Sequence, residues 1–179
     1  GQKNMKNLKL LFLSLFVIYH LSFITLIAQA AGYVLPYPSY MPGHKLYRVH
    51  QLWERIQEYW YFGNLAKFQY HLKMADKYLV ETKTLFEYDQ HFLATQSLKK
   101  SNRHFSQTSL FLEKAAKEEK DISQKKEILK NAAVKHTEVL NELLNRLPEE
   151  IIWREEKKES QRLAIKELLE GAKTIREKI

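Results

Sequence analysis

The sequence predicts an all-α fold: an antiparallel helical bundle of four to five long helices, preceded by a signal or anchor helix and a Pro-rich extended segment. Two observations lead to this expectation. The Lys, Glu, Leu and Ala content favours helix, and the chain holds only 5 Gly and 4 Pro. From Leu46 onward, apolar residues recur at steps of three and four, which is typical of helices with one buried face. No stretch of useful length alternates as a strand does.

Residues 1–30 have the pattern of a signal peptide. Met5 is the expected initiator, two lysines follow it, and the stretch from Leu10 to Ile27 is almost wholly apolar. The small residues around Ala30 predict cleavage after it or, alternatively, after Ala31. An uncleaved anchor is the competing interpretation, because the apolar stretch approaches the ~20 residues that span a bilayer. Either way, we expect the rest of the chain to lie outside the cytoplasm.

The remaining chain is expected to have three parts. Residues 31–45 are rich in Pro and Tyr and are predicted to be extended, because Pro fixes φ and lacks a backbone donor. Residues 46–147 are predicted to form a four-helix bundle. Residues 148–179 are predicted to form a C-terminal helix that starts at Pro148. Its polar stretch, residues 154–162, leaves two alternatives: the helix projects towards a partner, or it rejoins the bundle after Leu163.

The predicted bundle helices span about residues 44–62, 64–86, 90–120 and 124–146. Gly63 is expected to end the first helix and Asn64 to cap the second. In the first helix, the apolar residues that share one face are expected to be buried: Leu46, Val49, Trp53, Ile56 and Trp60.

Composition excludes several chemistries. The chain has no Cys, so it has no disulfide, no thiolate metal ligand, no thiol nucleophile and no cysteine for lipid attachment. Its formal charge is +8, but the acids and bases are interleaved along the later helices. A nucleic-acid partner is therefore not expected, because such proteins concentrate their cations in a patch or stripe.

Several short motifs occur in the first half of the chain: Leu35-Pro36-Tyr37-Pro38, Pro42, Leu46-Tyr47, Glu54-Arg55-Ile56 and the stretch from Leu72 to Leu79. With these motifs, and with the later stretch from Lys135 to Leu140, the chain resembles an exported bacterial family of unknown function that is common in small-genome candidate phyla. The resemblance covers roughly residues 33–148. It implies a helical fold and export, and it transfers no catalytic residue. Ser39, Met41 and Tyr78 stand where the family usually has Gly, Leu and Arg.

The charged residues of these motifs are candidate site residues: Glu54, Arg55, Asp76 and Lys77. We predict that Arg55 and Asp76 form an ion pair that bridges two helices and fixes their register. The alternative is a polar ligand-binding patch at the same seam.

Four successive aromatic residues, Tyr59, Trp60, Tyr61 and Phe62, form a second candidate. Four consecutive helical residues cannot all face one core. We expect the segment from Leu35 to Tyr40 to cover them. An interfacial belt or a partner-docking patch is the alternative.

The histidines show neither the i, i+4 spacing of a helical zinc site nor the Glu-x-x-His motif of di-iron bundles. Packing of the helices could bring His71, His104 and His136 together, but solvated or hydrogen-bonded histidines are expected. No cofactor and no catalytic residue are predicted.

These observations favour a non-enzymatic, extracytoplasmic binding or structural module that meets an envelope protein or polymer. Contact with a membrane is expected only through the N-terminal segment. The alternative is a ligand-carrying bundle that holds a metal, haem or small apolar molecule. The first hypothesis requires a filled core and an exposed patch, and the second requires a cavity lined by converging His, Asp or Tyr side chains.

Overall fold

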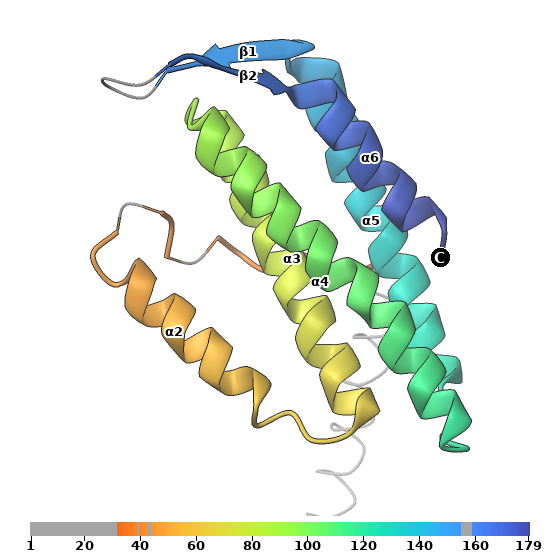
Figure 1. Ribbon diagram of the computed structural model, residues 1–179. Coiled ribbons are helices and arrows are strands. Elements are labelled where there is room, and N and C mark those ends of the chain that lie inside the picture. Colours follow the sequence, from red (N-terminus) through yellow and green to blue (C-terminus); the bar gives the residue numbers. More distant parts are fainter. Residues whose placement is uncertain (1–31, 39, 43, 155–158) are drawn as a thin grey trace, which may run out of the picture. The chain divides into compact units, whose positions relative to one another are not determined.

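The computed structural model describes residues 32–38, 40–42, 44–154 and 159–179 (Figure 1). The predicted signal segment, with Ala30 and Ala31, lies outside the described residues. Residues 35–179 form one compact unit. Its elements are α2 (Tyr47–Glu58), α3 (Asn64–Glu87), α4 (His91–Lys117), α5 (Ser123–Arg146), β1 (Glu150–Trp153), β2 (Gln161–Ala164) and α6 (Ile165–Glu177). The described chain is therefore mostly helical, as the sequence predicts.

Two antiparallel helix pairs build the bundle. Helix α3 packs along α4, and α5 packs along α6 (Figure 1). All four contribute to one apolar core, whose buried members are Leu79, Leu85, Phe86, Ala94, Leu98, Val139, Leu140, Leu143, Ile165, Leu169 and Ala172. Burying one such Leu or Phe side chain stabilises the fold by about 1.5–3 kcal/mol.

The connections between helices follow the sequence signals only in part: α2 ends at Glu58, before Gly63, and Gly63 rather than Asn64 occupies the cap position of α3. Gly63 stands before α3 with φ +82°, a conformation that costs glycine little and other residues more. At the turn between α3 and α4, Asp89 also has a positive φ of 56°, which Asp tolerates better than most residues. Pro148 follows the end of α5, where its missing backbone donor does not interrupt helical hydrogen bonds.

The predicted helix over residues 148–179 is wrong in its first half. Strands β1 and β2 pair as an antiparallel hairpin in which Ile151 is opposite Leu163 and Trp153 is opposite Gln161. Ile151 and Trp153 are half-buried, whereas Ile152 between them is exposed, so the side chains alternate as in a strand. β-Branched and aromatic residues favour strands. The fold is consequently not all-α, and only α6 realises the predicted C-terminal helix.

The C-terminal helix rejoins the bundle, which was one of the two predicted alternatives. Helix α6 returns to the bundle and buries Ile165, Leu169 and Ala172 in the common core. The polar stretch, residues 154–162, begins directly after β1 and ends within β2, and its residues 155–158 lie outside the described residues. No helix among the described residues is long and apolar enough to cross a bilayer.

Candidate functional site

Helix α2 meets the bundle with its polar side. Glu54, only 8% exposed, forms an ion pair with Lys77 of α3, and its backbone carbonyl accepts a hydrogen bond of 3.1 Å from the Tyr70 hydroxyl. At the first residue of α2, the Tyr47 hydroxyl donates to Glu81 of α3 at 2.8 Å. Ser97 of α4 donates to the same Glu81 oxygen at 2.5 Å. These bonds fix both the position and the rotation of α2.

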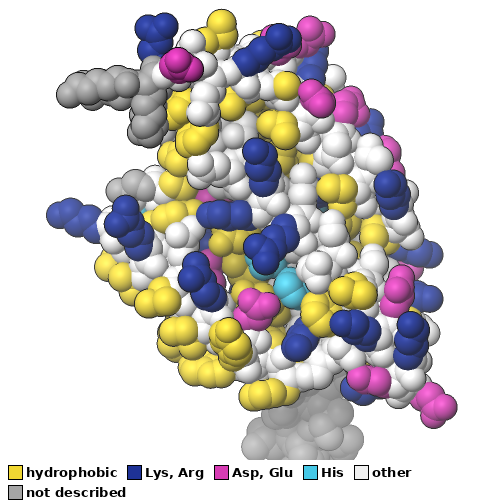
Figure 2. Space-filling model, in the orientation of Figure 1, with side chains coloured by type: hydrophobic (Ala, Val, Ile, Leu, Met, Phe, Trp, Pro, Cys, Tyr) yellow, Lys and Arg dark blue, Asp and Glu magenta, His cyan; other side chains and the backbone are white. Residues whose placement is uncertain are grey.

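The opposite side of α2 is apolar and exposed. We call it the outer face of α2, and it consists of Leu46, Val49, Leu52, Trp53, Ile56 and Trp60. Figure 2 shows it as a concentration of hydrophobic side chains at the lower left. The indole rings of Trp53 and Trp60 meet edge to face, with centroids 5.2 Å apart. The prediction that this stripe is buried is therefore wrong, because the hydrogen-bonding side chains of α2 face the bundle instead.

The aromatic run after α2 is only partly covered. Tyr61 packs against Tyr70, with ring centroids 5.3 Å apart, whereas Tyr59, Trp60 and Phe62 are exposed. The predicted cover lies elsewhere: Leu35 packs against the main core of the bundle, and Pro38 lies in a groove along α3 and α5. Coverage of the aromatic run by residues 35–40 is thus wrong, because the core offers Leu35 a more deeply buried site.

A cleft of about 650 Å³ opens between α2, α3 and α4. At its base, the imidazoles of His71 on α3 and His104 on α4 form a hydrogen bond between their Nδ1 atoms at 2.9 Å. Phe111 stacks on His71 with ring centroids 5.1 Å apart, and Tyr78 stacks on His104 at 5.7 Å. Figure 2 shows histidine side chains in a hollow of this face, with basic and acidic side chains around them.

The cleft keeps its histidines and tyrosines neutral. Burial first, and then His71 and nearby cations, together lower the pKa of His104 to about 4. Burial also lowers the pKa of His71. The pKa of Tyr70 is raised to about 12, first by burial and then by the charges of Glu58 and Glu54. At neutral pH the walls therefore offer uncharged imidazole and hydroxyl groups.

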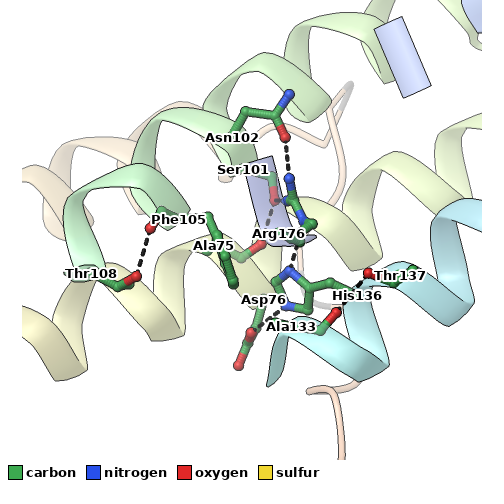
Figure 3. Close-up of polar contacts among 10 residues, drawn as sticks. All are labelled: Ala75, Asp76, Ser101, Asn102, Phe105, Thr108, Ala133, His136, Thr137 and Arg176. Carbon is green, nitrogen blue, oxygen red and sulfur yellow. Dashed lines mark hydrogen bonds and ion pairs between the residues drawn. The ribbon is translucent and has the colours of Figure 1, made fainter. Parts of the chain in front are cut away.

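A second polar cluster lies inside the bundle and joins α3, α4, α5 and α6 (Figure 3). His136 of α5 bonds Asp76 of α3 at 2.7 Å, and it accepts a bond of 3.2 Å from Arg176 of α6. Arg176, which is 1% exposed, also donates to Ser101 at 2.9 Å and to Asn102 at 2.5 Å on α4.

The hydrogen bonds of this cluster determine which nitrogen of His136 carries the ring proton. Because the Nδ1 atom of His136 accepts from Arg176, the ring proton is on Nε2 and is donated to Asp76. Burial lowers the pKa of His136 and that of Arg176, the latter to about 10, so the ring is neutral and the guanidinium stays charged at pH 7. Both ring nitrogens are occupied inside the core, which indicates an architectural role.

Three of the four predicted seam residues meet partners at helix interfaces, but not in the predicted pair. Glu54 pairs with Lys77 between α2 and α3, and Asp76 bonds His136 of α5. Arg55 is exposed on α2 and lines the cleft. The architectural role predicted for an Arg55–Asp76 pair is performed by Glu54 and Lys77. Of the predicted polar patch at this seam, Glu54 and Arg55 line the cleft, whereas Asp76 and Lys77 do not, and ligand binding there stays a prediction.

The three histidines that helix packing could unite are divided between two clusters. His71 and His104 meet in the cleft, whereas His136 belongs to the buried cluster. Within the part of the chain that the structure describes, no three His, Asp or Glu side chains are grouped to hold a metal ion.

The protein is thus a mainly helical bundle that carries a docked amphipathic helix and a polar cleft. Over residues 39–150, the chain matches the family described as "Domain of unknown function (DUF5667)", and it belongs to that family. Comparison with curated proteins gave no match, and comparison with solved structures gave none. The match covers α2 to α5, and therefore both walls of the cleft.

Two buried charged residues that hold the helices together, Arg176 and Glu81, were not predicted from the sequence. Arg176 continues the buried stripe of Ile165, Leu169 and Ala172 at helical spacing, so a charge within an apolar stripe was the available signal. Glu81 is buried at the junction of α2, α3 and α4. It is likewise a charged residue among the buried positions of its helix, α3.

Proposed function

We propose that the chain is a non-enzymatic binding module of the cell envelope, located outside the cytoplasm, that docks an envelope protein through the outer face of α2. The observation that carries this proposal is the orientation of α2, whose polar side is bonded to the bundle while its apolar side is exposed. Monomeric proteins rarely expose a contiguous apolar patch without a use for it.

The composition of the outer face of α2 favours a protein partner. Trp53 and Trp60 contact each other on it, and Arg48 is exposed beside it. Trp and Arg are enriched among the residues that contribute most to protein–protein affinity. The bonds from Tyr47 and Glu54 hold the helix in place before a partner arrives, which lowers the entropic cost of binding.

Photo-crosslinking in the native envelope tests this proposal. A benzophenone amino acid replaces Val49, which is 62% exposed on α2, or the matched control Val134, which is 60% exposed on α5. We expect one discrete protein adduct from position 49, and we expect it to disappear when Trp53→Ala and Trp60→Ala are combined. The adduct should form again from the purified partner and the full chain. Adducts with lipid only, or the same adduct from position 134, would refute the docking proposal.

A second candidate, a ligand-carrying bundle, is favoured by the cleft. His71, His104, Tyr70 and Tyr78 converge there, as that hypothesis requires. The cleft and the outer face of α2 lie on different sides of this helix, so the two candidates do not compete for residues.

A further inference from the structure

Two cations on α4 line the cleft without an ion-pair partner. Among the described residues, no carboxylate lies within ion-pair distance of Lys100 or Arg103. The same holds for Arg55 on the opposite wall. By contrast, Lys77 nearby is neutralised by Glu54. Glu54 and Glu58 also line the cleft, but Glu54 is paired with Lys77, so three cations without an ion-pair partner there face one carboxylate without one, that of Glu58.

Lys100 shows this imbalance most clearly. Its ammonium group lies over the ring of Tyr78, 5.1 Å from the centroid. Burial lowers the pKa of Lys100, and the attraction of Glu81 and Glu54 offsets this only from beyond ion-pair distance. Withdrawing an ammonium group from water is costly unless a counter-charge comes close. An anion in the cleft would supply that counter-charge.

The field at His104 disfavours a metal ion. Each charged side chain that acts on the pKa of His104 is a cation, namely Arg103, Lys100 and Lys77. His71 lies in a mixed field, because Glu58 raises its pKa whereas Arg103 and Lys67 lower it. A metal bound by both rings would have to enter the positive field at His104. An anion would be attracted by it. The histidine pair can also donate to an anion, because the ring that accepts at Nδ1 carries its own proton on Nε2.

The remaining lining suits an apolar body attached to the charged group. Met74, Tyr70, Tyr78 and Phe111 line the same cleft. Its volume of about 650 Å³ is within the range of small-molecule sites, which combine apolar walls with a few polar groups.

We infer that the cleft between α2, α3 and α4 binds a small organic anion: an aromatic or aliphatic body that carries one carboxylate or phosphate group, with the anionic oxygens on Lys100 and Arg103. This assignment goes beyond the docking role of α2 and uses different residues.

Binding of simple probes to the full chain in neutral detergent tests this inference. The probes are benzoate, phenyl phosphate and the neutral benzamide, measured by calorimetry and ligand-observed NMR at low salt. At least one of the two anions should bind with a Kd on the order of 1 mM. Benzamide should bind at least about tenfold more weakly, because it lacks the charge that Lys100 and Arg103 attract. The anion that binds more tightly indicates whether the natural ligand carries a carboxylate or a phosphate group.

Matched variants separate the site from a general charge effect. Lys100→Gln and Arg103→Gln should each weaken binding of the preferred anion by about tenfold, since a hydrogen bond to a charged group contributes roughly 1.5–3 kcal/mol. Lys99→Gln, at the exposed neighbouring position of α4, should leave binding unchanged. Circular dichroism confirms that each variant is folded. Equal binding of benzamide, equal weakening by Lys99→Gln, or binding of neither anion would overturn the inference. None of these results alters the crosslink expected from position 49.

Discussion

Arg176 places a positive charge in the centre of the bundle, where an unpaired ion would be very costly. Three helices supply what it needs: Ser101 and Asn102 on α4, His136 on α5, and Asp76 on α3 beyond the imidazole. Because these partners come from different elements, the cluster is complete only when α6 has the correct register. We therefore assign it the role of aligning α6 with the rest of the bundle.

Replacing Arg176 tests this role. Arg176→Leu removes the buried donor that His136, Ser101 and Asn102 share and breaks a buried charge network, so we expect the free energy of unfolding to fall by about 3–5 kcal/mol. Arg146→Leu serves as the control, because Arg146 is exposed and its ion pairs span 3.8 Å. Its loss should cost less than about 1 kcal/mol. Urea titration compares the two variants, and equal midpoints would show that the buried cluster does not stabilise the fold.

The histidines of the cleft make stability depend on pH. Burial, together with His71, Arg103 and Lys100, lowers the folded-state pKa of His104 to about 4. In the unfolded chain, a histidine has a pKa near its ordinary value of about 6.5. Between these values the unfolded state binds more protons, so stability rises with pH. The contribution is complete above about pH 6.5 and is lost as the pH falls towards 4.

Urea unfolding at pH 7 and at pH 5 measures this dependence. The midpoint should be lower at pH 5, and His104→Gln should reduce the difference between the two pH values, because one of the groups that resists protonation is gone. His44→Gln, at an exposed position before α2, serves as the control. A midpoint that rises on acidification would contradict the neutral state assigned to the histidine pair.

At the scale of elements, the sequence predicts α3, α4 and α5 to within a few residues. Their apolar stripes are long, and Gly63 and Pro148 mark boundaries whose cause is local. Helix α2 was predicted as an element but with the wrong face inward. A period of 3.6 residues shows that a helix is amphipathic, but it does not show which face a neighbour covers. In α2, that choice depends on Lys77 and Glu81 of another helix.

The hairpin could not be predicted from period alone. Each strand has four residues, too few for an alternation of two to stand out from a helical pattern. A tertiary contact contributes to the outcome, since Trp153 stacks on Phe92 of α4 with ring centroids 4.1 Å apart. The candidate site could not be predicted for the same reason. The contact of His71 with His104 depends on the register of two helices, which their separate sequences do not determine.

At the scale of the whole molecule, stability and binding are assigned to different parts. The pairs α3–α4 and α5–α6 bury a continuous core and align it through Arg176. Helix α2 adds little to that core, since its buried side is polar and its apolar side is exposed. Our central claim is that this exposed side is covered by a partner in the envelope.

Cysteine labelling tests that claim most directly, because the chain has no Cys of its own and a single introduced thiol is unambiguous. Val49→Cys on α2 and Val134→Cys on α5 are treated with a polar maleimide, first in the purified full chain and then in the intact envelope. We predict that both react rapidly in the purified chain, and that position 49 alone is protected in the envelope. Equal labelling of position 49 in both settings would contradict the account, as would slow labelling of position 49 in the purified chain.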